Sequence, residues 1–503
     1  MMTKFTETAI VREITQFQLS MAYPVIFAIL CVISGLSNKY VYVPILFVMT
    51  LLVLFSVFFV RNSKALLVPM FMMYYSLGTD NINTYQPTKG ELFASIDNDA
   101  WIFIISIAVT FFIALAIRFV RDGTFQYALQ NRGVAFWGIA ALDIAFISNG
   151  AFSPDWMSGD LFIGLLLAAF LSLFYLVFSS IISRSDVGII TYVCKLMVLT
   201  ALIVTAQILF KAIHTHITEG LLYYHEAAGR WFFKRDMLCM SWEITTMAGG
   251  VLVLGIPAAL YLAKDEKKPI LYYLSALLFA AMPFIMNPRS SMACGVICFF
   301  IGMVIICFNG KNRKFNLIFS LSLLLLVASA ITSLCFYLNS IGLLGHYLHE
   351  LSMLLRLDVF TDRLDLIKVG IQHFSEAPVF GVGMYKGAPS NGVEFNNVFA
   401  NMYHNIIVQI AASMGIVGIS AFLFHIKDLF FIGIKKFDFG RILILLMPLS
   451  ILLMSLADNF FFYPNFLIFY AAFIVLAEKE LSIKFERKTN ENPSVGRSTK
   501  DKY

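Results

Sequence analysis

DLFIGLLLAAFLSLFYLVFSSII, residues 160–182, is an unbroken apolar run whose only charge, Asp160, lies at its start. Two further runs are similar, DAWIFIISIAVTFFIALAIRFV at 99–120 and FNLIFSLSLLLLVASAITSLCFYL at 315–338. An α-helix needs about 20 consecutive, mainly apolar residues to cross the hydrocarbon core of a bilayer. These runs therefore predict helices that span a membrane.

The composition extends this prediction to most of the chain. Of its 503 residues, 59% are hydrophobic and 14% are charged, and its mean hydropathy is +0.80. Soluble proteins carry about 25% charged residues. We therefore predict an all-α, polytopic membrane protein that is surrounded by membrane lipid and has no nucleic-acid partner. Its 7 cysteines form no CxxC pair, so neither a disulfide framework nor a metal site is predicted.

Hydropathy along the chain predicts about fourteen transmembrane helices. KDEKK at 264–268 and NGKNRK at 309–314 then fall on the same side of the membrane as most other Lys and Arg residues. Because such residues gather on the cytoplasmic side, both termini are expected to be cytoplasmic. The largest segment on the outer side is 339–403, which is expected to carry amphipathic helices.

The same pattern divides the chain into three parts. Residues 1–242 form an N-terminal transmembrane bundle with outer loops, and 243–478 form a transmembrane core that includes the outer loop 339–403. Residues 479–503 form a basic cytoplasmic tail. The tail is polar and poor in apolar residues, so we expect it to be disordered.

Arg289 lies in NPRSSMACG, 287–295, at the predicted outer start of a span. The preceding Pro288 suits the first turn of a helix, and the unsatisfied N–H groups of that turn favour anions. A guanidinium adds bidentate geometry for phosphate. Arg289 is therefore either a phosphate ligand or an interfacial residue that anchors the turn.

The large outer loop contains LLRLDVFTDRLDLIKVGIQHF, residues 354–374. Arg356 and Arg363 would share one face of a continuous helix, where neighbouring aspartates could pair with them on a solvated surface. Lys386 follows in a Gly/Asn-rich stretch that could fold over a substrate. The pattern leaves both a binding role and a solvated surface open.

MYHNIIVQIAASMGIVG, residues 402–418, begins a span with His404 and Asn405. An imidazole exchanges protons near neutral pH, so His404 could serve as a general base on a hydroxyl. The alternative is a buried, hydrogen-bonded histidine that caps the helix. Further along, Gly415 and Gly418 belong to a stripe of small residues that would let another helix approach closely.

These features resemble the bacterial O-antigen ligase and O-antigen polymerase superfamily. His404–Asn405, nine residues, Gly415, two residues and Gly418 match its histidine motif at each fixed position. PRSSMACG at 288–295 and DRLDLIKVGIQHFSEAPVFGVG at 362–383 are similar to its two arginine segments, and Asp458 at an outer turn is also similar. The resemblance covers roughly residues 240–478.

The resemblance implies a GT-C-like fold and a metal-independent glycosyltransferase without cofactors. Its donor would be an undecaprenyl-diphosphate-linked oligosaccharide, and its acceptor a hydroxyl of a sugar or lipid-linked molecule. Carried over by position, His404 would be the general base, and Arg289 and Arg363 would bind the diphosphate. The auxiliary candidates are Asn405, Arg356 and Lys386. The active site would lie on the outer face of the cytoplasmic (inner) membrane, with other polysaccharide-assembly proteins as further candidate partners.

Three functions are compatible with this resemblance or with the hydropathy. A polymerase would join lipid-linked repeat units of a cell-surface polysaccharide, and a ligase would transfer the glycan to a lipid or protein acceptor. No acceptor-binding domain follows the last predicted span, which favours a polymerase. The third function is a transporter or flippase of the same glycan. It would need several basic residues within its spans, and only Lys195 lies deep in one, so we expect an enzyme.

Overall fold

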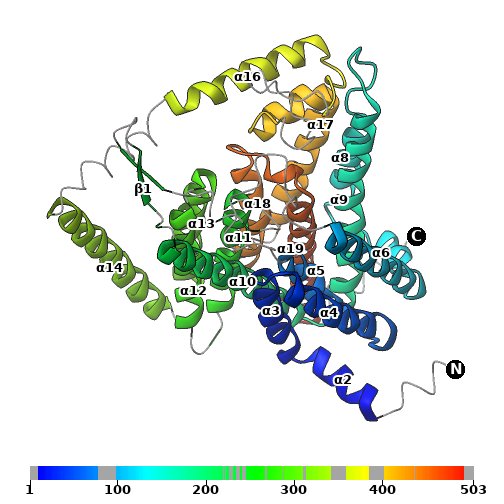
Figure 1. The fold of residues 1–503 in the computed structure, drawn as a ribbon. Coiled ribbons are helices and arrows are strands. Elements are labelled where there is room, and N and C mark those ends of the chain that lie inside the picture. The colour runs from blue at the N-terminus through cyan, green and yellow to red at the C-terminus, as the bar shows by residue number, and fades with distance from the viewer. Residues whose placement is uncertain are drawn as a thin grey trace.

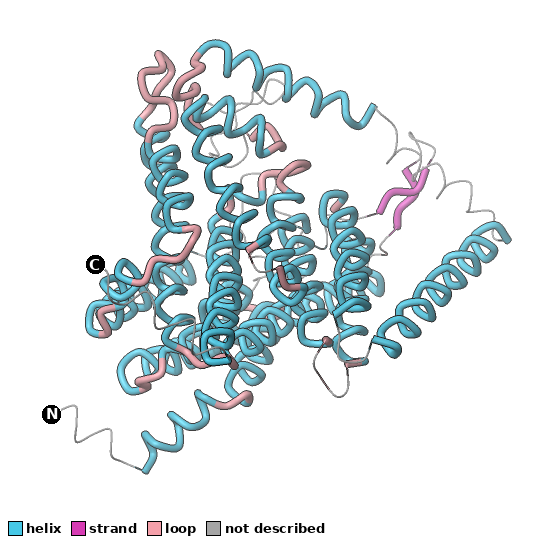
Figure 2. Tube along the Cα trace, turned by 180° about the vertical axis from the view of Figure 1, so that it is seen from behind, coloured by secondary structure: helices cyan, strands magenta, loops and turns pink. Residues whose placement is uncertain are grey.

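The structure is a computed structural model dominated by helices (Figure 1). It describes residues 9–77, 98–218, 220, 222–225, 230–233, 238, 240, 245–264, 266, 269–286, 288–309, 313–340, 358–384, 402–435 and 437–491. The α-helices are α2 (Ala9–Leu19), α3 (Ala22–Gly35), α4 (Lys39–Phe59), α5 (Leu67–Met72), α6 (Asn98–Arg121), α7 (Thr124–Gln130), α8 (Phe136–Ile147), α9 (Ser158–Arg184), α10 (Ile189–Thr218), α11 (Thr245–Ala263), α12 (Ile270–Met286), α13 (Arg289–Asn309), α14 (Arg313–Ser340), α16 (Asp358–Glu376), α17 (Ile406–Ile434), α18 (Phe439–Met454) and α19 (Pro464–Glu491). The shorter elements are the 3₁₀-helices η1 (Ser63–Leu66), η2 (Met73–Ser76) and η5 (Phe460–Phe462), and the antiparallel strands β1 (Leu222–His225) and β2 (Arg230–Phe233), which lie at one edge of the bundle in Figure 2.

Six helices among the described residues are long and apolar enough to cross a membrane: α4, α9, α10, α11, α13 and α17. The pair α2 and α3, bent by 79°, would make seven if it is one span. α8, α12 and α18 are apolar but shorter. The protein is therefore a multi-pass helical membrane protein, as predicted, whereas the predicted number of about fourteen spans is not confirmed. α19 continues to Glu491, so helix includes the first part of the segment 479–503 that was predicted to be disordered.

α11 is the most buried of these spans, with 94% of its apolar window inside the protein. Its glycines explain this position, because a side chain there would collide with a neighbour. A Cβ on Gly250 would lie 2.5 Å from Phe460, and one on Gly255 would lie 2.6 Å from Ala201 and 2.8 Å from Phe279. Neighbouring elements therefore pack directly on the α11 backbone. Residues from both the N-terminal and C-terminal halves of the chain share this hydrophobic core.

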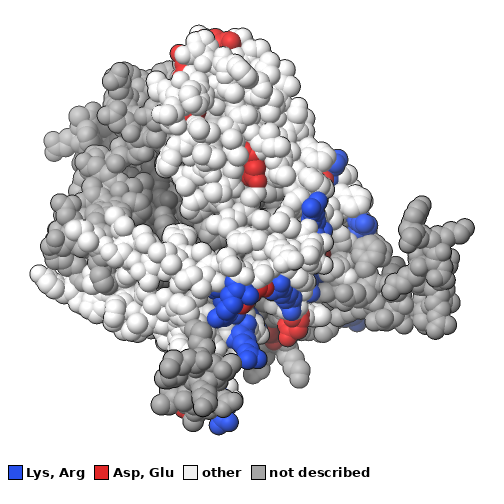
Figure 3. All heavy atoms as spheres, turned by 90° about the vertical axis from the view of Figure 1, so that its right-hand side faces the viewer, with Lys and Arg blue, Asp and Glu red and all other residues white. Residues whose placement is uncertain are grey.

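The two ends of the bundle differ in charge. The starts of α11, α13 and α17 meet at one end. The opposite end holds the ends of α4, α6 and α9, with Arg61, Arg118 and Arg184 beside them. Figure 3 shows Lys and Arg side chains gathered in the lower part of one face, below a broad area with few charges. This asymmetry is typical of membrane proteins, whose basic residues face the cytoplasm.

Two carboxylates from the C-terminal half hold the start of α8. Glu478 in α19 accepts hydrogen bonds from the backbone N–H of Ala135 at 2.7 Å and from the hydroxyl of Tyr175 at 3.1 Å. Asp428 in α17 accepts one from the N–H of Gly138 at 3.1 Å. The first N–H groups of a helix lack partners within that helix, and an anion near them is favoured. Both carboxylates therefore fix α8 against α17 and α19.

We expect Glu478→Ala to lower the thermal stability of the purified protein. The substitution leaves the N–H of Ala135 and the hydroxyl of Tyr175 without their acceptor, at a cost of about 1–3 kcal/mol per buried group. Glu478→Gln keeps one carbonyl oxygen as an acceptor and should have a smaller effect. Thermal unfolding in detergent, followed by intrinsic fluorescence, measures both variants, and an unchanged midpoint for Glu478→Ala would contradict this role.

Candidate functional site

The start of α17 is tied to the turn between α18 and α19. The side-chain amide of Asn405 donates to the carbonyl of Leu456 at 2.9 Å, and the N–H of Ile406 donates to the carbonyl of Ser455 at 2.7 Å. The side-chain oxygen of Asn405 also accepts two N–H groups of the first turn, at 3.0 and 3.1 Å. Asn405 is thus the N-cap of α17, and its amide joins two parts of the chain that are about 50 residues apart.

His404 is presented by an uncommon backbone conformation. Its φ is +51°, in the left-handed region that non-glycine residues enter rarely and that is enriched at functional sites. The preceding Tyr403 is fully buried, whereas the side chain of His404 is 39% exposed. Nδ1 of His404 donates to Oδ1 of Asp458 at 3.0 Å, and the same oxygen accepts the N–H of Asn459 at 3.0 Å. The carboxylate and the imidazole therefore fix each other's orientation.

This pair can perform proton transfer. With the Nδ1–H donated to a carboxylate, Nε2 is the nitrogen that can accept a proton, and the carboxylate stabilises the imidazolium that results. The sequence motifs point to His404 and Asn405, and Asp458 is predicted to lie at an outer turn. The hydrogen bond between His404 and Asp458 could not be predicted, because nothing in local spacing joins residues 54 positions apart.

α17 is broken at Gly415, which has φ 61° and ψ −152°. The backbone groups freed by the break bond to the segment 378–383, which precedes α17 in the chain. The N–H groups of Val382 and Gly383 donate to the carbonyls of Ala412 and Ser413 at 2.8 and 3.2 Å, and those of Ile416 and Val417 donate to the carbonyls of Pro378 and Val379 at 2.8 and 3.1 Å. The break therefore leaves the main chain hydrogen-bonded on both sides of Gly415.

This arrangement corrects the interpretation of Gly415 and Gly418 as parts of one continuous helical stripe. A Cβ on Gly415 would lie 2.5 Å from the carbonyl carbon of Val379. The missing side chain of Gly415 therefore makes room for the turns of the segment 378–383 and not for another helix. A Cβ on Gly418 would lie 2.4 Å from Cβ of Met414, across the break. Gly418 therefore makes room for the bend in its own helix.

The same segment reaches the N-terminal half of the chain. The N–H of Gly150 donates to the carbonyl of Phe380 at 2.8 Å, and the N–H of Met384 donates to Oδ1 of Asn149 at 2.9 Å. The amide of Asn149 in turn donates to the carbonyl of Asp160 at 2.9 Å. The turn between α8 and α9 thus supports the break in α17. No sequence pattern pointed to Asn149 and Gly150, although the Pro-x-x-Gly-x-Gly spacing at 378–383 indicates close backbone contact at that segment.

Arg289 is the first residue of α13 and is exposed, while Pro288 before it is buried. Ser291, two residues further on, donates from its hydroxyl to the carbonyl of Thr246 at 3.4 Å and contacts the sulfur of Met454 at 3.8 Å. Met454 directly precedes Ser455, to which the start of α17 is bonded. The starts of the helices that carry Arg289 and His404 therefore lie against the same end of α18.

α16 forms within the large segment 339–403 and packs on the start of α17. A Cβ on Gly370 would lie 2.2 Å from Val408, and His373 Nδ1 lies 2.5 Å from the hydroxyl oxygen of Tyr403. Arg363 lies on α16 two turns before Gly370. Arg356 and Lys386 lie outside the described residues.

Two further histidines, His373 and His425, have structural surroundings. His373 is buried beside Tyr403, and burial together with the nearby Glu376 raises the pKa of Tyr403, which keeps this phenol neutral. His425 in α17 is buried and its Nε2 is 2.7 Å from the hydroxyl oxygen of Tyr470. Within the described part of the chain, no group of three or more His, Cys, Asp or Glu side chains could hold a metal ion.

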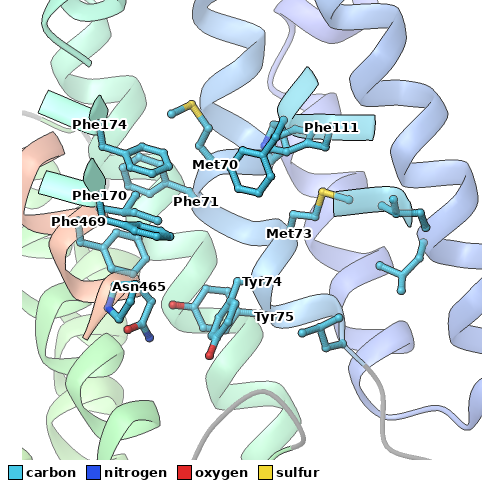
Figure 4. A pocket seen from close by; sticks show the side chains of 17 residues that line it. Met70, Phe71, Met73, Tyr74, Tyr75, Phe111, Phe170, Phe174, Asn465 and Phe469 are labelled. Carbon is cyan, nitrogen blue, oxygen red and sulfur yellow. The ribbon is translucent and has the colours of Figure 1, made fainter. Parts of the chain in front are cut away.

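An apolar pocket of about 360 Å³ lies between α5, α6, α9 and α19 (Figure 4). Phe174, Met70 and Phe111 lie toward one end in Figure 4, and the polar groups of Tyr74, Tyr75 and Asn465 lie toward the other. Asn465 is the second residue of α19, which follows the turn that contains Asp458. The pocket can accept a hydrocarbon chain, with its polar end on the side of that turn.

We expect Gly415→Ala to disrupt the site. Its backbone conformation is essentially restricted to glycine, and a Cβ would lie 2.5 Å from the Val379 carbonyl carbon. Gly433→Ala is the matched control, since a Cβ there would make only an ordinary contact, 3.5 Å from Leu445. Thermal unfolding and protease resistance of the two purified variants should separate them, with only Gly415→Ala destabilised. Equal stability would show that the break tolerates a side chain.

Residues 274–423 match the family model described as O-antigen ligase. None of the curated proteins matches the chain. The matched segment includes Arg289, Arg363, His404 and the break at Gly415, whereas Asp458 lies beyond it. The match supports a membrane function of the O-antigen ligase or polymerase type and gives no support to the transporter alternative. Through residues 274–423, this chain is similar to the O-antigen ligase family, which supports the O-antigen ligase/polymerase superfamily that its sequence motifs predicted.

Proposed function

We propose that this protein is a membrane glycosyltransferase that polymerises undecaprenyl-diphosphate-linked oligosaccharide repeat units into a cell-surface polysaccharide. The observation that carries the proposal is the half-exposed imidazole of His404, oriented by a carboxylate at the end of a membrane helix bundle. Ligase-type transfer to a lipid or protein acceptor would use the same groups and is the alternative.

The proposed reaction forms one glycosidic bond and breaks one bond to phosphate. Nε2 of His404 takes the proton from the acceptor hydroxyl, whose oxygen attacks the anomeric carbon of the donor. The bond between that carbon and the diphosphate oxygen breaks, and undecaprenyl diphosphate leaves with the electron pair. Asp458 stabilises the imidazolium until the proton is released to solvent. The diphosphate leaving group is already activated, so the step needs no cofactor.

Arg289 and Arg363 are proposed to bind the diphosphate and stabilise the charge that develops as it leaves. The exposed position of Arg289 at the first turn of α13 supports this role, because a guanidinium and a helix N-terminus both favour an anion. For Arg363 the support is its place on α16, which packs on the start of α17. Arg356 and Lys386 remain auxiliary candidates.

The donor's lipid and the membrane orientation follow from the same proposal. The apolar pocket between α5, α6, α9 and α19 could hold part of a prenyl chain. The basic end of the bundle, opposite the start of α17, would face the cytoplasm, and the site would face outward from the cytoplasmic membrane. Both termini would then be cytoplasmic.

We expect His404→Asn to abolish transfer while the protein remains folded. Asparagine tolerates the left-handed backbone conformation of residue 404 better than most residues, so the loss reports on the imidazole. Removal of a general base lowers the rate by about 10²–10⁴-fold. Asp458→Asn should cause a smaller loss, and His216→Asn, at an exposed position in α10, should cause none. Wild-type turnover in His404→Asn would refute the assignment.

Arg289→Ala should slow turnover more than Arg289→Lys, because only the latter keeps a positive charge beside the leaving group. Both variants are assayed in purified form with an undecaprenyl-diphosphate oligosaccharide. Arg313→Ala, at the start of α14, is the matched control for loss of an exposed arginine from a first helical turn. Equal rates for Arg289→Ala and Arg313→Ala would exclude a role for Arg289 in diphosphate binding.

The same assay separates the two proposed acceptors. A ladder of products from donor alone would support polymerisation. Product formed only when a lipid or protein acceptor is added would favour the ligase alternative, and no product with either acceptor would refute both.

A further inference from the structure

A second, polar pocket of about 700 Å³ lies at the basic end of the bundle. Three stretches of chain form it: the link between α4 and α5, the end of α6, and the end of α9 with the residues that follow. Arg61, Lys64, Asp122 and Arg184 line it. None of these residues belongs to the segment 274–423 or to the site around His404.

Arg118 builds the frame of this pocket. Its guanidinium is buried and donates to the carbonyls of Val57 at 2.9 Å, Val60 at 2.6 Å and Arg61 at 2.7 Å. It also forms an ion pair with Asp122. The end of α4 is thereby bound to the end of α6, and the backbone of Arg61 is held in place.

The cations at the rim are also held in place. Nζ of Lys64 lies 4.0 Å from the ring centre of Tyr192, and the guanidinium carbon of Arg184 lies 4.1 Å from that of Tyr127. Arg184 donates to the carbonyl of Asp122 at 2.9 Å. These contacts already restrict the motion of the two side chains. An anion that binds them therefore costs less side-chain entropy.

Positive charge exceeds negative charge in and around the pocket. The five cations are Arg61, Lys64, Arg118, Arg121 and Arg184, and the two carboxylates are Asp122 and Asp186. Asp122 already pairs with Arg118 and Arg121. Neither Arg61 nor Lys64 forms an ion pair within the described part of the chain. The pocket can therefore neutralise an added anion.

The surface beside the pocket is apolar. Ile113, Ile117 and Val120 on α6 are 56%, 51% and 76% exposed, and they lie just before Arg121 and Asp122 in the same helix region. A cationic pocket that adjoins an exposed apolar helix face fits a molecule with a phosphate at one end and hydrocarbon chains at the other. A free phosphate ion would use only the pocket.

We propose that this pocket binds the phosphate-bearing headgroup of an anionic membrane phospholipid, with its acyl chains along α6. Binding of this kind ties the ends of α4, α6 and α9 to the membrane surface. The proposal is independent of the reaction assigned to His404, because the two sites lie at opposite ends of the bundle.

The experiment uses native mass spectrometry of the protein. The protein is first delipidated in a neutral detergent, and lipids with matched acyl chains are then added. We expect phosphatidylglycerol to be retained and phosphatidylcholine to be lost. The double variant Arg61→Gln/Lys64→Gln should bind phosphatidylglycerol roughly thirtyfold more weakly, from the usual contribution of two basic residues at a membrane surface. If the double variant does not fold, the single variant Arg61→Gln takes its place in the binding measurement. This substitution changes only an exposed side chain and keeps the backbone carbonyl of residue 61.

Arg313→Gln/Lys314→Gln is the matched control, since it removes the same charge from exposed positions of α14 outside the pocket. Equal weakening in both double variants would overturn the proposal in favour of diffuse attraction to a basic surface. Equal retention of the two lipids would also overturn it. Displacement of phosphatidylglycerol by millimolar inorganic phosphate would identify the free ion, and not a lipid, as the ligand.

Discussion

A main chain surrounded by hydrocarbon must find its hydrogen-bond partners within the protein. The break in α17 at Gly415 is where this constraint is hardest to meet, because an apolar helix loses its regular bonding there. The segment 378–383 supplies the hydrogen-bond donors and acceptors that the broken helix lacks. The residues between α8 and α9 hold that segment in place through further hydrogen bonds. The direction of the first half of α17, and so the position of His404, depends on this chain of backbone contacts.

The candidate site and the basic end show how one helix bundle separates two kinds of electrostatic surface. At one end, a half-exposed imidazole is oriented by Asp458, and Arg289 is exposed at the first turn of α13. At the other end, Arg118 and Arg121 donate to carbonyls at the end of α4, and Arg184 at the end of α9 donates to the carbonyl of Asp122 at the end of α6. An activated anionic substrate and an anionic lipid surface would therefore meet different faces of the same molecule.

The sequence was sufficient for the membrane class and for the resemblance to the superfamily, and it named His404 and Arg289 as candidates for the site. Apolar length predicts helices directly, and the spacing of His404, Gly415 and Gly418 is a local pattern. Contacts between distant segments could not be derived in this way. Glycines in an apolar helix indicate close packing between helices, yet Gly415 makes room for the turns of the segment 378–383 instead of a helix. The pairing of His404 with Asp458 needs the fold of α18 and α19, which no spacing encodes. The number of spans and the division at 242/243 stay predictions.

The partners of His404 and of the segment 378–383 have a consequence for the biosynthesis of the protein. Ribosomes release a membrane chain from its N-terminus, and helices enter the bilayer broadly in that order. Asn149 and Gly150 are thus already in place when 378–384 emerges, so early helices serve as a template for the break in α17. Asp458 emerges later than both of these segments. A nascent chain would therefore form the break in α17 before the hydrogen bond between His404 and Asp458 can form.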